Sequence, residues 1–293
     1  MLSGFRTAFV HDAVCPHVSP VHCAEAESAG TPIPAHDHEQ TLLFGTLNAN
    51  AIYAVQPDLQ IFVGIPLQYR RTTISYSLLD TGESYMPPYA GIHHRNETLL
   101  GIGDPEISGQ KFFRKNHYLL GIAVGSSIPL GKIEENPYQL ALQGEQHQHL
   151  QLGTGVFIPS VTVTGMYVKE EQGFIMQVRS EFSWYENQYS YHTGSAVRLD
   201  LGYWRKIDKR TILLGQIRGN YEQPDEWMGL TAPYSERQTI GLAGALTWRM
   251  TESTELIIRY EQMVWLQTFR SPIEDSDGNI PLHSILSIGA AIF

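Results

Sequence analysis

Histidine and cysteine are the residues of this sequence whose types and spacing most directly suggest chemistry. Three histidine pairs fall in its polar segments, namely His36 with His38, His93 with His94, and His147 with His149. Imidazole is a ligand for Zn and Cu ions, so these pairs could form a metal site, although no spacing among them matches a closed structural zinc site. The alternative is that histidine serves here only as a common polar loop residue.

Two cysteines, Cys15 and Cys23, lie close together near the N-terminus. In an oxidising compartment they could form a disulfide that closes a small loop. Two free thiols and a shared metal ion are the competing interpretations, and the sequence leaves all three open.

Charged residues at alternate positions of strand-like segments form a second candidate set. Mixed charges that line a hydrated interior could set ion or solute selectivity. Opposite charges could instead pair and hold that interior together, and we favour pairing for most of them. The set consists of Asp104, Glu106, Arg179, Glu181, Arg198, Asp200, Arg218, Glu255, Arg259 and Glu261.

Motifs for bond chemistry are missing from the sequence. It contains no Gly-x-Ser-x-Gly, His-Glu-x-x-His or Gly-x-x-x-x-Gly-Lys motif. Gly101 and Gly103 lie in a strand-like run with no helix after it, so they do not form a dinucleotide site. We therefore expect no enzymatic activity and no cofactor beyond the Zn or Cu considered above. The net charge of -10 without a basic stripe argues against a nucleic-acid partner.

The elements that must position these residues read as β-strands. Apolar and polar residues alternate in runs such as 59–70, 174–184, 197–203, 240–248 and 256–266. Alternation gives each strand one apolar and one polar face. Many polar positions are Gly, Ala, Ser, Gln or mixed Arg and Glu, which suits a hydrated interior. No run of about 18 apolar residues occurs, which excludes membrane-spanning helices.

The connections between these runs alternate in length. Short ones lie at 56–58, 114–116, 170–172, 208–209 and 251–253, and long ones lie near 80–97, 133–149, 186–193, 222–233 and 270–282. Short turns at one rim and long loops at the other are typical of outer-membrane barrels. About eleven strands follow residue 41, and an even count requires one more upstream, for which 5–14 is the candidate.

The pattern therefore predicts an all-β fold, a transmembrane antiparallel up-and-down β-barrel of about twelve strands. Short periplasmic turns and long extracellular loops join the strands. We expect residues 41–293 to form the barrel. Residues 1–40 are expected to supply a weak first strand and a Cys/His loop or plug.

The chain ends in a strand-like run, 283–293, that finishes on Phe293. This ending resembles the C-terminal signal of bacterial outer-membrane barrels. The resemblance implies the outer membrane as the location, and the lipid bilayer and the outer-membrane assembly machinery as partners. No long apolar segment follows Met1, so we expect a mature or recombinant form whose signal peptide is not in the sequence.

Four blocks resemble the outer-membrane transporter family named for the meta-pathway of phenol degradation, the MetA-like barrels. The blocks are 50–66, 101–109, 120–132 and 153–160. In the last block, Ile158 replaces the Asp that usually precedes the Pro in this family. The resemblance covers roughly residues 41–170 and implies a transporter or channel, with hydrophobic or aromatic compounds as candidate solutes and no family-wide catalytic residues.

We therefore expect an outer-membrane channel or transporter for passive passage of a small solute. The first alternative is a metal-binding surface protein that uses His-rich loops. The second is a plugged barrel with a structural or partner-docking role, and the third is a soluble β-sandwich.

Overall fold

The fold is known from a computed structural model of the chain. The residues it describes are 2–9, 33–34, 36–88, 90–91, 96–147, 150–232, 235–268 and 284–292. Within these residues the structure is almost entirely β, and no helix of the described part is long and apolar enough to cross a membrane.

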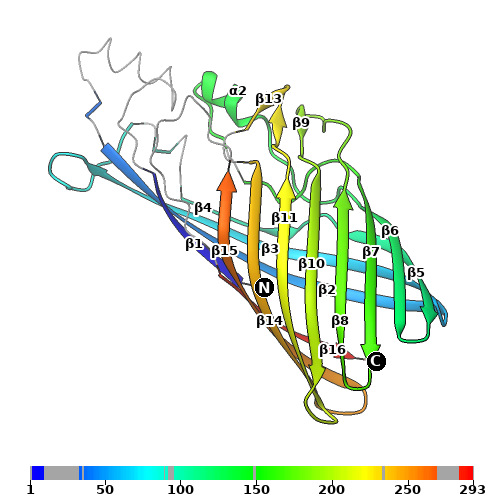
Figure 1. The fold of residues 1–293 in the computed structure, drawn as a ribbon. Helices are drawn as coiled ribbons and strands as arrows, with labels where there is room; N and C mark the ends of the chain where they lie inside the picture. The colour runs from blue at the N-terminus through cyan, green and yellow to red at the C-terminus, as the bar shows by residue number, and fades with distance from the viewer. Residues whose placement is uncertain are drawn as a thin grey trace.

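Long strands make up the wall of the molecule (Figure 1). They are β1 (Leu2–Phe9), β2 (His36–Gln56), β3 (Leu59–Leu78), β4 (Glu97–Ile102), β5 (Glu106–Lys115), β6 (Tyr118–Ser127), β7 (Ile158–Lys169), β8 (Gln172–Glu181), β10 (Ala196–Lys206), β11 (Thr211–Glu222), β14 (Arg237–Arg249), β15 (Thr254–Thr268) and β16 (Ser284–Ile292). Helix α2 (Pro137–Leu142) and strands β9 (Tyr191–His192), β12 (Glu226–Trp227) and β13 (Leu230–Thr231) lie in the long loops.

The strand pairings are antiparallel and run in a ring. β1 pairs with β2 along its length and with β16 at Leu2 and Leu286, while β2 pairs with β3. β4 and β5 both pair with β3 and are separated only by 103–105, so they act as one strand. The described residues therefore form twelve barrel strands, which confirms the predicted fold. A closed ring leaves no strand edge whose backbone N–H and C=O groups would lack hydrogen-bond partners in lipid.

The first strand overlaps the candidate taken from the sequence but is shifted toward the N-terminus. β1 covers Leu2–Phe9, whereas the sequence pattern suggested 5–14. Residues 10–14 lie outside the described residues. β2 begins at His36. Its first residues therefore lie in the segment 1–40, which was expected to be a loop or plug.

The connections alternate in length as expected. Short turns occupy 57–58, 116–117, 170–171, 207–210 and 250–253, and long connections join the opposite strand ends. Asn116 and Glu170 open two of the short turns with positive φ, 52° and 55°, which two-residue hairpins require. We call the two ends of the barrel the short-turn rim and the long-loop rim.

The two faces of the wall differ in chemistry. Outward positions carry large apolar side chains that remain open, such as Leu201 and Ile217, which are 44% and 54% exposed. The alternate inward positions are polar, and Asp200 beside Leu201 is only 4% exposed. A soluble β-sandwich buries its apolar face, so this arrangement belongs to a barrel whose outside meets lipid.

Aromatic residues mark one boundary of that apolar surface. A row of aromatic residues crosses four neighbouring strands, β6, β7, β8 and β10, close to the short turns. Each residue is paired with the next across the sheet, in the order Tyr118, Tyr167, Phe174 and Tyr203. The rings of Tyr118 and Tyr167 lie 5.2 Å apart, as do those of Phe174 and Tyr203. Such rows sit at the interface between hydrocarbon and water in membrane barrels.

Candidate functional site: the polar lumen and its loop cap

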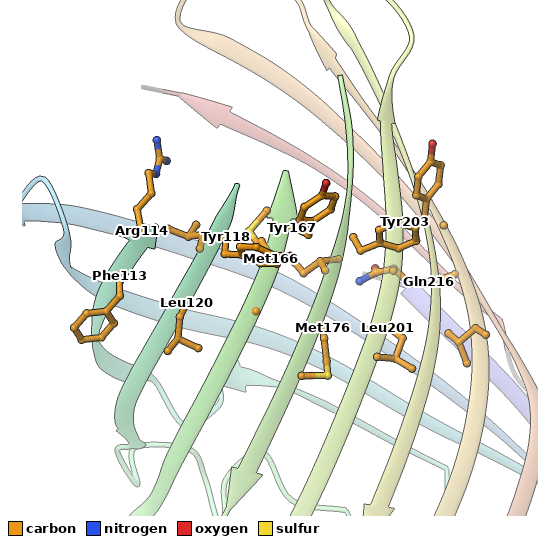
Figure 2. A pocket seen from close by; sticks show the side chains of 18 of the residues that line it. Phe113, Arg114, Tyr118, Leu120, Met166, Tyr167, Met176, Leu201, Tyr203 and Gln216 are labelled. Carbon is orange, nitrogen blue, oxygen red and sulfur yellow. The ribbon is translucent and has the colours of Figure 1, made fainter. Parts of the chain in front are cut away.

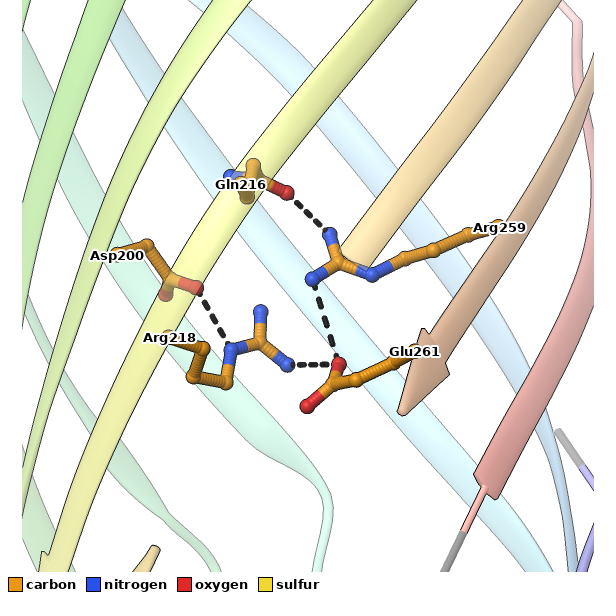
Figure 3. A network of polar contacts seen from close by, with 5 residues as sticks. All are labelled: Asp200, Gln216, Arg218, Arg259 and Glu261. Atoms are coloured by element: carbon orange, nitrogen blue, oxygen red, sulfur yellow. Dashed lines mark hydrogen bonds and ion pairs between the residues drawn. The ribbon is translucent and has the colours of Figure 1, made fainter. Parts of the chain in front are cut away.

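A five-residue ion network lies on the inner wall, and we call it the β10–β15 network (Figure 3). Arg218 donates from Nε to Asp200 Oδ1 at 2.6 Å and from Nη1 to Glu261 Oε2 at 2.7 Å. Arg259 donates to Gln216 Oε1 at 2.7 Å and to Glu261 Oε2 at 3.4 Å. Two arginines and two carboxylates balance, so the network is neutral.

Small residues on β14 allow this network to form. Arg218 lies on β11 and Glu261 on β15, so their side chains must meet over the strand between them. The inward positions of β14 at that level are Gly241 and Ala243. A side chain on Gly241 would stand within 3.3 Å of Glu261 Oε1, so the small residues leave the space that the arginine crosses.

A second ion cluster, the β5–β8 network, lies on the neighbouring part of the inner wall. Arg179 donates to Glu106 Oε1 at 2.8 Å and to Glu181 Oε1 at 2.9 Å. Glu106 is on β5 and Arg179 on β8, so this contact also passes over intervening strands. Arg198 on β10 is paired with Arg179 in register and makes no ion pair with the described residues.

A small cavity of about 210 Å³ adjoins the β5–β8 network. Its lining combines the charged pair with neutral polar and apolar side chains, which are Ile52, Gln60, Phe62, Glu106, Ser108, Gln110, Ala123, Thr162, Gln177 and Arg179. Amide and hydroxyl groups dominate that wall. The cavity therefore offers hydrogen bonds to a solute without offering an unpaired charge.

The remaining charged candidates lie at the two ends of the barrel. Glu255 accepts hydrogen bonds from Arg249 at 3.1 and 3.2 Å beside a short turn. Asp104 lies at the break between β4 and β5. Its Oδ1 accepts from Gly131 N at 2.9 Å, and its Oδ2 accepts from Thr154 N at 2.7 Å and from Thr154 Oγ1 at 2.9 Å.

Asp104 thus joins three of the four sequence blocks that carry the family resemblance. Gly131 belongs to the block at 120–132 and Thr154 to the block at 153–160. The packing there is close, because a Cβ on Gly153 would lie 2.5 Å from Asp104 Oδ1. One carboxylate therefore ties both ends of the connection from 128 to 157 to the wall.

The same connection enters the barrel. A Cβ on Gly101 would meet Leu152 Cδ1 at 2.8 Å. Gly101 pairs with Gln68 at an inward-facing level of β3 and β4. Leu152, only 5% exposed, therefore packs against the inner side of the wall.

Three long connections are tied together into a structure that we call the loop cap, comprising 128–157 without 148–149, 182–195, and 223–232 with 235–236. Asn187 Nδ2 donates to Thr154 O at 3.0 Å, and Asn187 Oδ1 accepts from the backbone of Tyr191 at 3.2 Å. Asp225 Oδ1 accepts from Gly194 N at 2.9 Å. Each connection therefore contacts the next.

The centre of the cap is apolar. The rings of Tyr191 and Trp227 lie 4.8 Å apart, and each residue is 8% exposed. Val156, which also belongs to the cap, is fully buried. Burial raises the pKa of the Tyr191 phenol, and the Asp225 carboxylate raises it further, so the ring stays neutral in the cap. Sequence reasoning did not identify these cap residues, because they lie in irregular polar segments.

The histidine pairs are only partly described. His36 is 1% exposed, its Nδ1 lies 2.8 Å from Pro34 O, and its ring contacts Tyr76 and Tyr85. His147 is 4% exposed with Nδ1 2.9 Å from Glu145 O. Among the described side chains no group of three or more His, Cys, Asp or Glu could hold a metal ion.

Several predicted residues fall outside the described part of the chain. They are Cys15, Cys23, His93, His94, His149 and Phe293. The disulfide, the metal site and the C-terminal signal therefore stay predictions.

Comparison with known structures places this architecture among outer-membrane proteins. The structure is similar to the COG4313 outer membrane channel from Pseudomonas putida F1, with a TM-score of 0.56 and 13% sequence identity, covering 100% of this chain and 94% of that chain. A Pseudomonas aeruginosa FadL homologue gives a TM-score of 0.43 with 11% identity, covering 88% and 68% of the two chains. OmpT of Vibrio cholerae gives 0.41 with 8% identity, covering 99% and 95%.

No protein-family model matches the chain, and no curated protein matches it in sequence. The resemblance to MetA-like barrels therefore stays a prediction about the family. The likeness to the Pseudomonas putida channel concerns the fold. This chain has the fold of a bacterial outer-membrane β-barrel.

Proposed function

We propose that this protein is an outer-membrane channel that lets a small solute pass down its concentration gradient. The observation that carries the proposal is a ring of strands with lipid-compatible side chains outside and a hydrogen-bonding, charge-paired wall inside. Here the inner wall offers amide, hydroxyl and ionic groups.

The charges of the inner wall support a solute of low charge. In the β10–β15 network two arginines face two carboxylates, and in the β5–β8 network Arg179 and the nearby Arg198 face Glu106 and Glu181. Both sums are zero, so these two networks carry no excess of one sign to select ions. Phe62 and Ile52 beside the amides of the cavity would accept a solute with apolar and polar parts. Such solutes include the aromatic compounds implied by the resemblance to MetA-like barrels.

The loop cap supports a narrow entrance rather than an open pore. Leu152 and the connection that carries it lie against the inner wall, and Asp104 and Asn187 fix that position. Size selection would then occur at the long-loop rim, and the polar wall would provide the path below it.

Swelling of proteoliposomes tests the proposal directly. The full chain is reconstituted into phospholipid vesicles, and the vesicles are mixed with isosmotic uncharged sugars and aromatic alcohols of increasing size. We expect swelling with small solutes, a size cut-off, and no need for an energy source. Inserted protein that gives no solute entry would favour the plugged or partner-docking alternative.

A further inference from the structure

The outer wall carries an apolar hollow that the channel does not use. Its volume is about 1100 Å³, and it extends over β5 to β14 near the short-turn rim (Figure 2). Outward-facing side chains supply most of its lining, including Leu120, Phe174, Met176, Leu201 and Tyr203. These belong to the surface that faces lipid.

Glycines at outward positions create the hollow. Gly165 pairs with Leu120 on one side and Met176 on the other, within a row of large apolar residues. Gly215 follows Tyr203 in the aromatic row. A Cβ at either glycine would meet nothing within 4 Å. Gly165 therefore leaves a gap between Leu120 and Met176, and Gly215, which is paired with Gly244, leaves a wider gap beside Tyr203.

Cationic side chains border the hollow on the side of the short turns. Lys115 is paired with Tyr118 at the end of the aromatic row. Lys169 and Arg205 both pair with Gln172, two residues closer to the short turns than the aromatic row. All three are exposed, and none makes an ion pair with a described residue.

Two other cations at this rim are paired with acids. Lys111 contacts Asp58 at 2.6 Å, and Lys206 contacts Glu171 at 3.3 Å. Arg114, Lys209 and Arg210 at this rim also make no ion pair with a described residue. Lys115, Lys169 and Arg205 differ from them because they lie at outward positions that follow the border of the apolar hollow. Glu170 is the acid next to Lys169 in the chain, and it belongs to the turn between β7 and β8.

We propose that the hollow is a binding site for one anionic phospholipid. An acyl chain would lie in the gaps at Gly165 and Gly215, and the headgroup phosphate would lie against Lys115, Lys169 and Arg205. The aromatic row, which includes the Gly215 gap, lies next to the headgroup, at the depth where a glycerol backbone meets hydrocarbon. Basic residues beside a membrane attract anionic headgroups, and a zwitterionic lipid would gain only the apolar contacts.

Native mass spectrometry of the detergent-purified chain tests this site. Phosphatidylglycerol and phosphatidylcholine with identical acyl chains are added in turn, and bound lipids are counted. We expect one tightly bound phosphatidylglycerol molecule per chain and weaker binding of phosphatidylcholine. Replacing Lys115, Lys169 and Arg205 by Gln should remove the preference, with a loss of about fivefold in affinity for each cation. Lys206→Gln at the same rim is the control and should leave the preference intact.

A second variant tests the hollow separately from the charges. Gly165→Leu should fill the gap and weaken both lipids, while Gly109→Leu, at an outward glycine away from the hollow, should change neither. Equal binding of the two lipids by the unmodified chain would overturn the proposal, as would an unchanged preference in the triple variant. Tight binding that persists in Gly165→Leu, or a second copy of the chain in place of lipid, would also overturn it. Lipid counting does not depend on solute passage, so it is independent of the channel proposal.

Discussion

At the scale of single residues, Arg218 is the group on which the inner wall depends most. It contacts both Asp200 and Glu261, whose side chains are 5% and 14% exposed. Removing one member of a buried ionic cluster leaves the other charges without compensation. The lumen is hydrated on one side, which reduces that penalty.

Replacing Arg218 by Leu should therefore destabilise the barrel and change its selectivity. We expect a loss of about 1–3 kcal/mol in the free energy of unfolding, measured by urea unfolding in lipid vesicles. The uncompensated carboxylates should also make the channel prefer cations, measured as a shift in reversal potential. The double variant Arg218→Leu with Glu261→Gln restores neutrality, so it should lose the cation preference. An unchanged reversal potential in the single variant would contradict the placement of this network in the solute path.

Asp104 offers a second test at this scale. Asp104→Asn replaces an acceptor oxygen by an amide that faces N–H and O–H donors, so the connection from 128 to 157 should loosen. We expect about tenfold faster proteolytic cleavage there, since hydrogen bonds to a charged group contribute roughly 1.5–3 kcal/mol. Asp208→Asn is the matched control, because Asp208 accepts two backbone hydrogen bonds at the opposite rim. Equal cleavage of both variants and the unmodified chain would contradict the role of Asp104.

The sequence predicts which side chains face inward, but not which of them contact one another. Alternation identified the charged positions, but it did not show that Arg218 reaches Glu261 over β14, because that contact depends on register and on Gly241. His36 is a candidate metal ligand because of its spacing to His38, and that remains a prediction. The structure adds that its ring lies against Tyr76 and Tyr85, a packing that a sequence pattern does not encode.

At the scale of elements, strands and loops differ in how far the sequence predicts them. β10 shows Leu199, Leu201 and Tyr203 outward and Arg198 and Asp200 inward, as the period of two requires. The loop cap depends on contacts such as Asn187 with Thr154, which join segments far apart in sequence. No local propensity determines such contacts, so they were not predicted.

Gly153 tests whether the cap sets the entrance. Gly153→Val would place a side chain within 2.7 Å of Gly131 Cα and against Asp104, so the connection must move. We expect larger solutes to enter proteoliposomes in this variant. Gly91→Ala is the control, because a Cβ there meets nothing within 4 Å. If Gly153→Val kept the original size cut-off, the entrance would have to lie elsewhere.

At the scale of the whole molecule, the ring of strands separates two environments. Its outer surface exposes Leu, Ile, Phe and Tyr side chains that only lipid can cover, and its inner surface keeps charges paired. This division follows from alternation once the ring closes through β1, β2 and β16. We propose that the interior is a continuous aqueous path.

Single-channel conductance in a planar lipid bilayer tests that claim most directly. We expect discrete current steps with little preference between cations and anions, a cation preference in Arg218→Leu, and larger steps in Gly153→Val. Stable insertion without current steps, in the unmodified chain and in Gly153→Val alike, would contradict it.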